Sequence, residues 1–60
     1  MTTYHFYHYD GKGYAYDTIE APDDEEAYYG TKQLGLNVMI GFFTSKAEAD
    51  EALYCRIHDC

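Results

Sequence analysis

Residues 4–21 read YHFYHYDGKGYAYDTIEA, and this stretch decides the fold. Two runs rich in Tyr, Phe, Thr and Ile, residues 2–9 and 14–21, flank the segment Asp10-Gly11-Lys12-Gly13. Aromatic and β-branched residues favour strands, and a short segment rich in Asp and Gly between two such runs is typical of a hairpin turn. The sequence therefore predicts two antiparallel strands joined by a tight turn.

The even length of the turn predicts the register of the two strands. Pairing residue 9 with 14 and residue 7 with 16 places four rings on one surface, the tyrosine face, which consists of Tyr7, Tyr9, Tyr14 and Tyr16. The opposite side carries the candidate core residues Tyr4, Phe6, Ala15 and Ile19. We therefore expect the tyrosine face to be left uncovered. A change of one residue in the register would reverse the two sides.

Two helices are predicted after the hairpin. Pro22 and the acidic residues 23–26 suit a helix start, because carboxylates interact favourably with the positive end of the helix dipole. We expect this helix from about Asp23 to Leu34, with Gly35 at its C-terminal stop. The segment Ser45-Lys46-Ala47-Glu48 has the capping-box pattern, which predicts a second helix from about Lys46 to Ile57.

Residues 36–43, LNVMIGFF, form a short apolar run that predicts a third strand buried on at least one face. The chain is then a single α+β domain over residues 1–60, with a three-stranded antiparallel sheet and two helices in the order ββαβα. The second helix has an apolar stripe that would cover the sheet, and we expect both helices to share one face. The stripe consists of Ala49, Ala52, Leu53 and Ile57.

The chain is strongly acidic, with 11 Asp and Glu against 4 Lys and Arg and a net charge of −7. Direct nucleic-acid binding is disfavoured, because phosphate contacts need clustered Lys and Arg. The charge favours a partner with a basic surface. The candidate contacts form an acidic cluster, defined as Asp17, Glu20, Asp23, Asp24, Glu25 and Glu26. These carboxylates could imitate phosphates, or they could cap a helix and maintain solubility.

The tyrosine face is the second candidate binding surface. Tyrosine is enriched at interface hot spots because its ring is rigid and its hydroxyl can form hydrogen bonds. The alternative is that cross-strand aromatic pairs stabilise the hairpin, by about 0.2–1 kcal/mol each, without any partner.

Catalysis and metal binding have little support in the sequence. A chain of 60 residues has no room for a deep pocket, so we expect no enzyme and no cofactor. His5 and His8 fall on opposite sides of a strand and cannot share an ion. A zinc site at Cys55, His58 and Cys60 would lack a fourth ligand, so we expect free thiols.

No segment approaches the roughly 18 apolar residues of a membrane span. The start Met1-Thr2-Thr3 lacks the basic and apolar regions of a signal peptide. We therefore expect a cytoplasmic protein without membrane contact.

With these features the chain resembles the small, acidic, phage-encoded anti-CRISPR proteins that inhibit type I CRISPR-Cas complexes, with type I-C among the candidates. The resemblance rests on size, charge, the hairpin YHFYHYDGKGYAYDTIEA and the acidic DDEE at residues 23–26. It implies a DNA mimic that binds a Cas subunit in the host cytoplasm and blocks recognition of target DNA. The acidic cluster would then meet Lys and Arg of the Cas surface, and the tyrosine face would anchor the contact.

The alternative to this inhibitor is a non-catalytic interaction module. Such a module would bind another protein, or a second copy of itself, through the tyrosine face or a strand edge. Both readings allow a monomer or a weak dimer.

Overall fold

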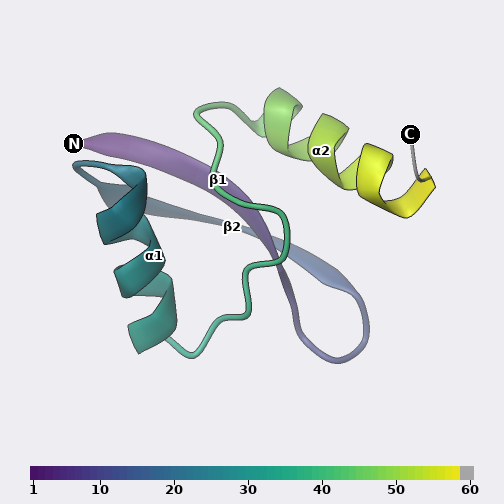
Figure 1. Ribbon diagram of the computed structural model, residues 1–60, viewed down its shortest axis with the longest axis horizontal. Helices are drawn as coiled ribbons and strands as arrows, with labels where there is room; N and C mark the ends of the chain where they lie inside the picture. Colours follow the sequence, from purple (N-terminus) through teal and green to yellow (C-terminus); the bar gives the residue numbers. More distant parts are fainter. Residues whose placement is uncertain (59–60) are drawn as a thin grey trace.

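The centre of the structure is a twisted two-stranded antiparallel ribbon (Figure 1). The computed structural model describes residues 1–58. Strand β1 spans Thr2–Tyr9 and strand β2 spans Tyr14–Ala21. The register pairs Tyr7 with Tyr16 and the last residue of β1 with the first residue of β2, so the predicted hairpin is confirmed.

The Asp10 side chain closes the turn between the strands. Its Oδ1 accepts hydrogen bonds from the backbone N–H groups of Lys12, at 3.0 Å, and Gly13, at 3.2 Å. The Lys12 bond is the main reason why the pKa of the Asp10 carboxyl is lowered, because hydrogen bonds to the ionised form favour it. Gly11 has a φ of +94°, which a residue without a Cβ adopts at no steric cost.

Residues 36–43 lie beside β1, but they do not form the predicted third strand. Two isolated antiparallel bridges, His5–Phe43 and His8–Val38, join this segment to β1. Between the bridges β1 advances by fewer residues than its neighbour, so a regular ladder is impossible. Gly41 is one of the extra residues between the two bridges, and its φ of +121° takes the backbone out of the extended conformation. The predicted ββαβα order is therefore wrong, and residues 1–58 have the order ββαα.

Helix α1 spans Asp24–Gln33, close to the predicted range. Asp23 is the N-cap, and its Oδ1 accepts a hydrogen bond from the backbone N–H of Glu26 at 2.9 Å. Gly35 has a φ of +75° and, as predicted, lies just beyond the end of the helix. The N–H groups of Gly35 and Leu36 donate to carbonyls of the last turn, at 3.0 Å each, which is the Schellman arrangement.

Helix α1 packs on the side of the ribbon that carries Ile19. A Cβ at Gly30 would lie 2.6 Å from Ile19 Cδ1, so the glycine within the helix permits a close approach. The ring of Phe6 packs on this side against Phe42, with centroids 5.4 Å apart. This is the best-buried part of the described chain, and its buried residues are Phe6, Ala21, Ala27 and Thr31.

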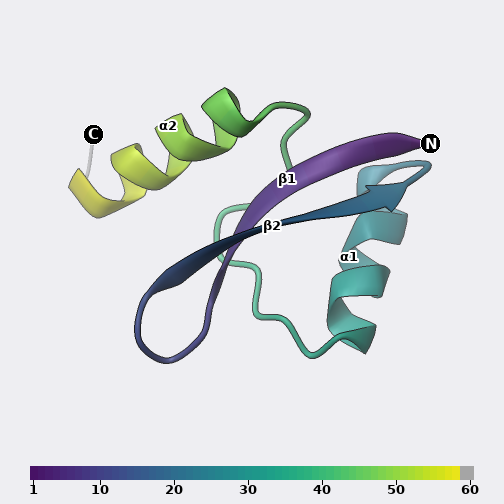
Figure 2. The ribbon, with the colours of Figure 1, turned by 180° about the vertical axis from the view of Figure 1, so that it is seen from behind.

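Helix α2 spans Lys46–His58 and begins after Ser45, whose Oγ accepts a hydrogen bond from the Glu48 N–H at 3.2 Å. The helix contacts the tyrosine face, so α1 and α2 lie on opposite sides of the ribbon (Figure 2). The prediction that both helices share one face is therefore wrong. The chain changes sides along residues 36–45, which run past the edge of β1 instead of continuing the sheet.

Candidate protein-binding surfaces

The four tyrosines of the tyrosine face pair across the two strands in the predicted register. The rings of Tyr7 and Tyr16 have centroids 5.7 Å apart, and those of Tyr9 and Tyr14 have centroids 6.0 Å apart. Cross-strand ring pairs of this kind stabilise a hairpin without any partner, so part of the tyrosine content has a structural role.

The tyrosine face is not left uncovered, because α2 lies against it. The hydroxyl of Tyr7 donates a hydrogen bond to Asp50 Oδ1 on α2. Arg56 Nε donates to the hydroxyl of Tyr14 at 3.3 Å. The expected open side is therefore partly occupied, and the rings that remain exposed are those of Tyr9, at 46%, and Tyr16, at 38%.

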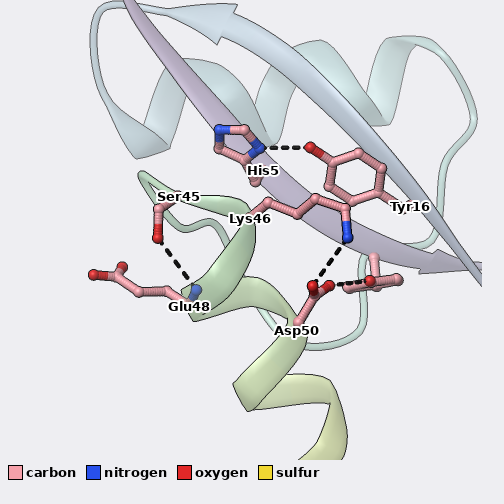
Figure 3. Close-up of polar contacts among 7 residues, drawn as sticks. His5, Tyr16, Ser45, Lys46, Glu48 and Asp50 are labelled. Atoms are coloured by element: carbon pink, nitrogen blue, oxygen red, sulfur yellow. Dashed lines mark hydrogen bonds and ion pairs between the residues drawn. The ribbon is translucent and has the colours of Figure 1, made fainter.

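A polar network fixes the start of α2 on the ribbon (Figure 3). Lys46 Nζ lies 2.9 Å from Asp50 Oδ2 and 5.0 Å from the centroid of the Tyr16 ring. The hydrogen bond from Tyr7, followed by that from Lys46, lowers the pKa of the Asp50 carboxyl. The same contact with Asp50 is the main reason why the pKa values of Tyr7 and Lys46 are raised. At neutral pH the three groups are therefore held as a phenol, a carboxylate and an ammonium ion.

The histidines of β1 lie on opposite sides of the ribbon, as predicted. His5 Nδ1 lies 2.6 Å from the hydroxyl of Tyr16, and the two rings stack with centroids 6.0 Å apart. The His8 ring instead lies 6.0 Å from the ring of Phe6 on the α1 side. His5 thus holds Tyr16 in place from one side while Lys46 lies over its ring.

An open groove of about 340 Å³ lies between α2 and the ribbon, a feature that the sequence did not suggest as a site. Tyr54 and Ile57 are 62% and 59% exposed at its rim. The Tyr54 and His58 rings have centroids 4.2 Å apart, so they form one aromatic surface at helical spacing. The i, i+4 spacing of Tyr54 and His58 was the signal in the sequence that could have indicated this aromatic surface. The groove is lined by Tyr7, Lys46, Asp50, Leu53, Tyr54, Ile57 and His58.

All six residues of the acidic cluster are exposed, but two of them also have local structural roles. Asp23 caps α1, and Asp17 Oδ1 accepts a hydrogen bond from the backbone N–H of Thr18 at 2.8 Å. Within residues 1–58 the side-chain ion pair is Lys46–Asp50, outside the cluster. The cluster therefore presents negative charge that no cation of the described chain neutralises.

The acidic cluster and the tyrosine face do not form one continuous surface. Tyr9 and Tyr14 are at the turn end of the ribbon, whereas the acidic residues 20–26 are at the far end of β2 and the start of α1 (Figure 1). These ends are separated by most of an eight-residue strand, or about 20 Å at 3.3 Å per residue. Tyr16 and Asp17 are neighbours in β2, but their side chains point to opposite faces of the ribbon. The cluster residue of β2 that shares a face with Tyr16 is Glu20, four residues further along the strand.

The predicted zinc alternative and the thiol expectation depend partly on Cys60, which lies outside the described residues. Within residues 1–58, no group of three His, Cys, Asp or Glu side chains is arranged to hold a metal ion. Cys55 is not a free cysteine, which corrects the expectation of a free thiol at that position.

No protein-family model, curated protein or solved structure matches this chain. In the part of the chain that the structure describes, neither helix is long and apolar enough to cross a bilayer. Function must therefore be inferred from the chain's own surface chemistry.

Proposed function

We propose that this protein is a non-catalytic inhibitor that binds a basic surface of a nucleic-acid-processing protein and excludes the nucleic acid. The observation that carries this proposal is the acidic cluster, whose carboxylates are exposed and have no cationic partner within residues 1–58. An uncompensated field of this kind attracts a basic surface and accelerates association with it.

The resemblance to anti-CRISPR proteins makes a Cas subunit of a type I complex the first partner to test, in the host cytoplasm. Steric and electrostatic competition with target DNA would be the mechanism. Direct binding of nucleic acid by this chain is disfavoured, because three of its four basic side chains already have partners. Lys32 lies over the Tyr28 ring, with its Nζ 5.2 Å from the ring centroid. Lys46 contacts Asp50, and Arg56 contacts Tyr14.

The contribution of the tyrosines divides into two parts. The Tyr7 hydroxyl donates a hydrogen bond to α2 and the Tyr14 hydroxyl accepts one from it, so the role of these two residues is mainly structural. Tyr9 and Tyr16 retain exposed rings and are the better anchors for a partner. We expect Tyr16→Ala to cost about 2 kcal/mol of binding free energy, as a hot-spot tyrosine does.

The proposal is tested by measuring association with a purified type I Cas complex and competition with its target DNA. Asp24→Asn with Glu25→Gln removes two charges from the first turn of α1 and leaves the Asp23 cap intact. At low salt we expect association to slow by about tenfold and its salt dependence to flatten.

The matched control is Glu48→Gln with Glu51→Gln, which removes two exposed charges from α2. This variant should associate nearly as fast as the parent chain. Equal behaviour of the two variants, or DNA binding unaffected by the protein, would contradict the proposal.

The second candidate is a self-association module, which the exposed rings of Tyr9 and Tyr16 favour. Sedimentation of the purified chain at increasing concentration separates the two functions. A tight dimer that Tyr16→Ala dissociates would support self-association, whereas a monomer would contradict it.

A further inference from the structure

Strand β2 has one edge that no residue of the described chain covers. Strand β1 is the middle element, because β2 pairs with one of its edges and residues 37–43 bond to the other. In the view from behind, β2 lies in front and neither helix is drawn across it (Figure 2). An uncovered edge of this length is a template for another strand.

The hydrogen bonds of β1 show which groups of β2 point outward. The backbone N and O of His5, the O of Tyr7 and the N of Tyr9 bond to residues 37–43. The backbone N–H and C=O groups of the odd-numbered residues of β1 therefore point away from β2. In an antiparallel pair, the backbone groups of the directly opposite residues point away from the partner strand as well. The outward backbone groups of β2 therefore belong to Tyr14, Tyr16, Thr18 and Glu20.

Three successive residues beside this edge are exposed, Tyr16, Asp17 and Thr18, and so is Glu20. The strand contains no Pro, Lys or bulge, and the devices that protect its edge are the charges of Asp17 and Glu20, which repel an acidic strand but not a basic one. Its one protective contact is the hydrogen bond from the Thr18 N–H to Asp17 Oδ1, which an incoming strand would have to replace.

Charge decides which strand fits. Asp17 and Glu20 flank the edge, and the acidic residues 23–26 follow directly. A second copy of the chain would bring another net charge of −7, so pairing between copies is opposed. A segment rich in Lys or Arg would place cations next to these carboxylates, and opposite charges across strands are favourable.

We infer that the open edge of β2 binds an extended, basic segment of a partner protein by adding it to the ribbon as a third strand. This mode deepens the proposed function and rests on it only for the positive charge of the partner. Backbone hydrogen bonds to Tyr16, Thr18 and Glu20 would supply the affinity, and Asp17 and Glu20 would select for charge.

The test uses two synthetic ten-residue peptides of alternating lysine and valine, one ordinary and one with every backbone amide N-methylated. Both carry the same charge, and only the first can pair with a strand. The ordinary peptide should slow hydrogen exchange at the Tyr16 and Glu20 amides but not at Asp17 and Ile19, which already face β1. The methylated peptide should bind at least about tenfold more weakly, since several backbone hydrogen bonds are lost.

Thr18→Lys places a cation on the open edge, and Gln33→Lys adds the same charge at an exposed position of α1. The first should weaken binding of the ordinary peptide by several-fold more than the second, because a lysine on an edge strand opposes pairing. Thr18→Pro removes an outward backbone N–H and should abolish binding of the ordinary peptide.

Equal binding of the two peptides, equal effects of the two lysine variants, or no protection at Tyr16 and Glu20 would overturn the inference. So would protection in the free protein that rises with its concentration, because a second copy would then be the occupant. These results are independent of competition with DNA, so the inference and the proposed function can fail separately.

Discussion

The two sides of the β1–β2 ribbon are covered by different kinds of packing. On the α1 side, Phe6 and Thr31 are 1% exposed and Ala27 is fully buried. On the α2 side, tyrosine rings reach the helix through their hydroxyl groups, and Tyr16 remains 38% exposed. Stability from apolar burial therefore belongs mainly to the α1 side, whereas the α2 side keeps surface available for a partner.

The largest effect is expected from removing the core ring on the α1 side. Phe6→Ala should lower the free energy of unfolding by about 3–5 kcal/mol, which is comparable to the whole stability of a domain this small. Urea denaturation followed by circular dichroism measures the change. Tyr29→Ala, at a residue that is 52% exposed on α1, is the control and should change little. Similar losses for both variants would show that Phe6 does not form the core of the α1 side.

The close approach of α1 to β2 is tested by a double-mutant cycle at Gly30 and Ile19. Alanine at position 30 gains about 1 kcal/mol of helix propensity but meets the Ile19 methyl group. Ile19→Val removes that methyl group. We therefore expect Gly30→Ala to be nearly neutral alone and stabilising by about 1 kcal/mol in the Ile19→Val background. Strict additivity of the two changes would rule out the contact.

On the α2 side, Tyr7→Phe keeps the ring and removes the hydrogen bond to Asp50. The expected loss is about 0.5–1 kcal/mol of unfolding free energy, because the bond is partly solvated. Tyr9→Phe is the matched control, since the Tyr9 hydroxyl makes only a 3.4 Å contact with the Gly11 carbonyl. Thermal unfolding of both variants gives the comparison, and a larger loss for Tyr9→Phe would refute the assignment.

The smallest effect is the pH dependence of that same bond. The pKa of Asp50 is lower in the folded chain, so its contribution is present above the ordinary carboxyl pKa of about 4 and disappears as the pH falls through the folded value. The stability difference between the parent chain and Tyr7→Phe should therefore shrink between pH 5 and about pH 2. Asp10 titrates in both proteins and cancels. A difference that stays constant over this range would show that Asp50 is not the acceptor.

The local features of the chain were predictable from sequence because their causes are local. The turn at residues 10–13, the helix start near Asp23 and the stop at Gly35 each depend on neighbouring residues, and the structure confirms them, with Asp23 as the N-cap instead of the first helical residue. The strand register follows from the turn, so the composition of the tyrosine face followed as well.

The failures concern contacts between distant parts of the chain. An apolar run such as residues 36–43 is typical of a strand. Its two bridges to β1, however, are separated by different numbers of residues on the two segments, and Gly41 has a positive φ. The apolar stripe of α2 shows that the helix packs on something, but it does not say on which side of a two-sided ribbon. The polar partners of Tyr7 and Tyr14 on α2 are separated from them by 43 and 42 residues, so no local pattern marks them.

That separation also orders the assembly of the chain in time. The hairpin and α1 need only residues 2–33, so their contacts can form in microseconds once these residues have left the ribosome. Helix α2 ends 25 residues later, so its long-range contacts with Tyr7 and Tyr14 form after the local ones. Until α2 docks, the tyrosine face is open to other chains, and docking covers Tyr7 and Tyr14 while the outer edge of β2 stays open.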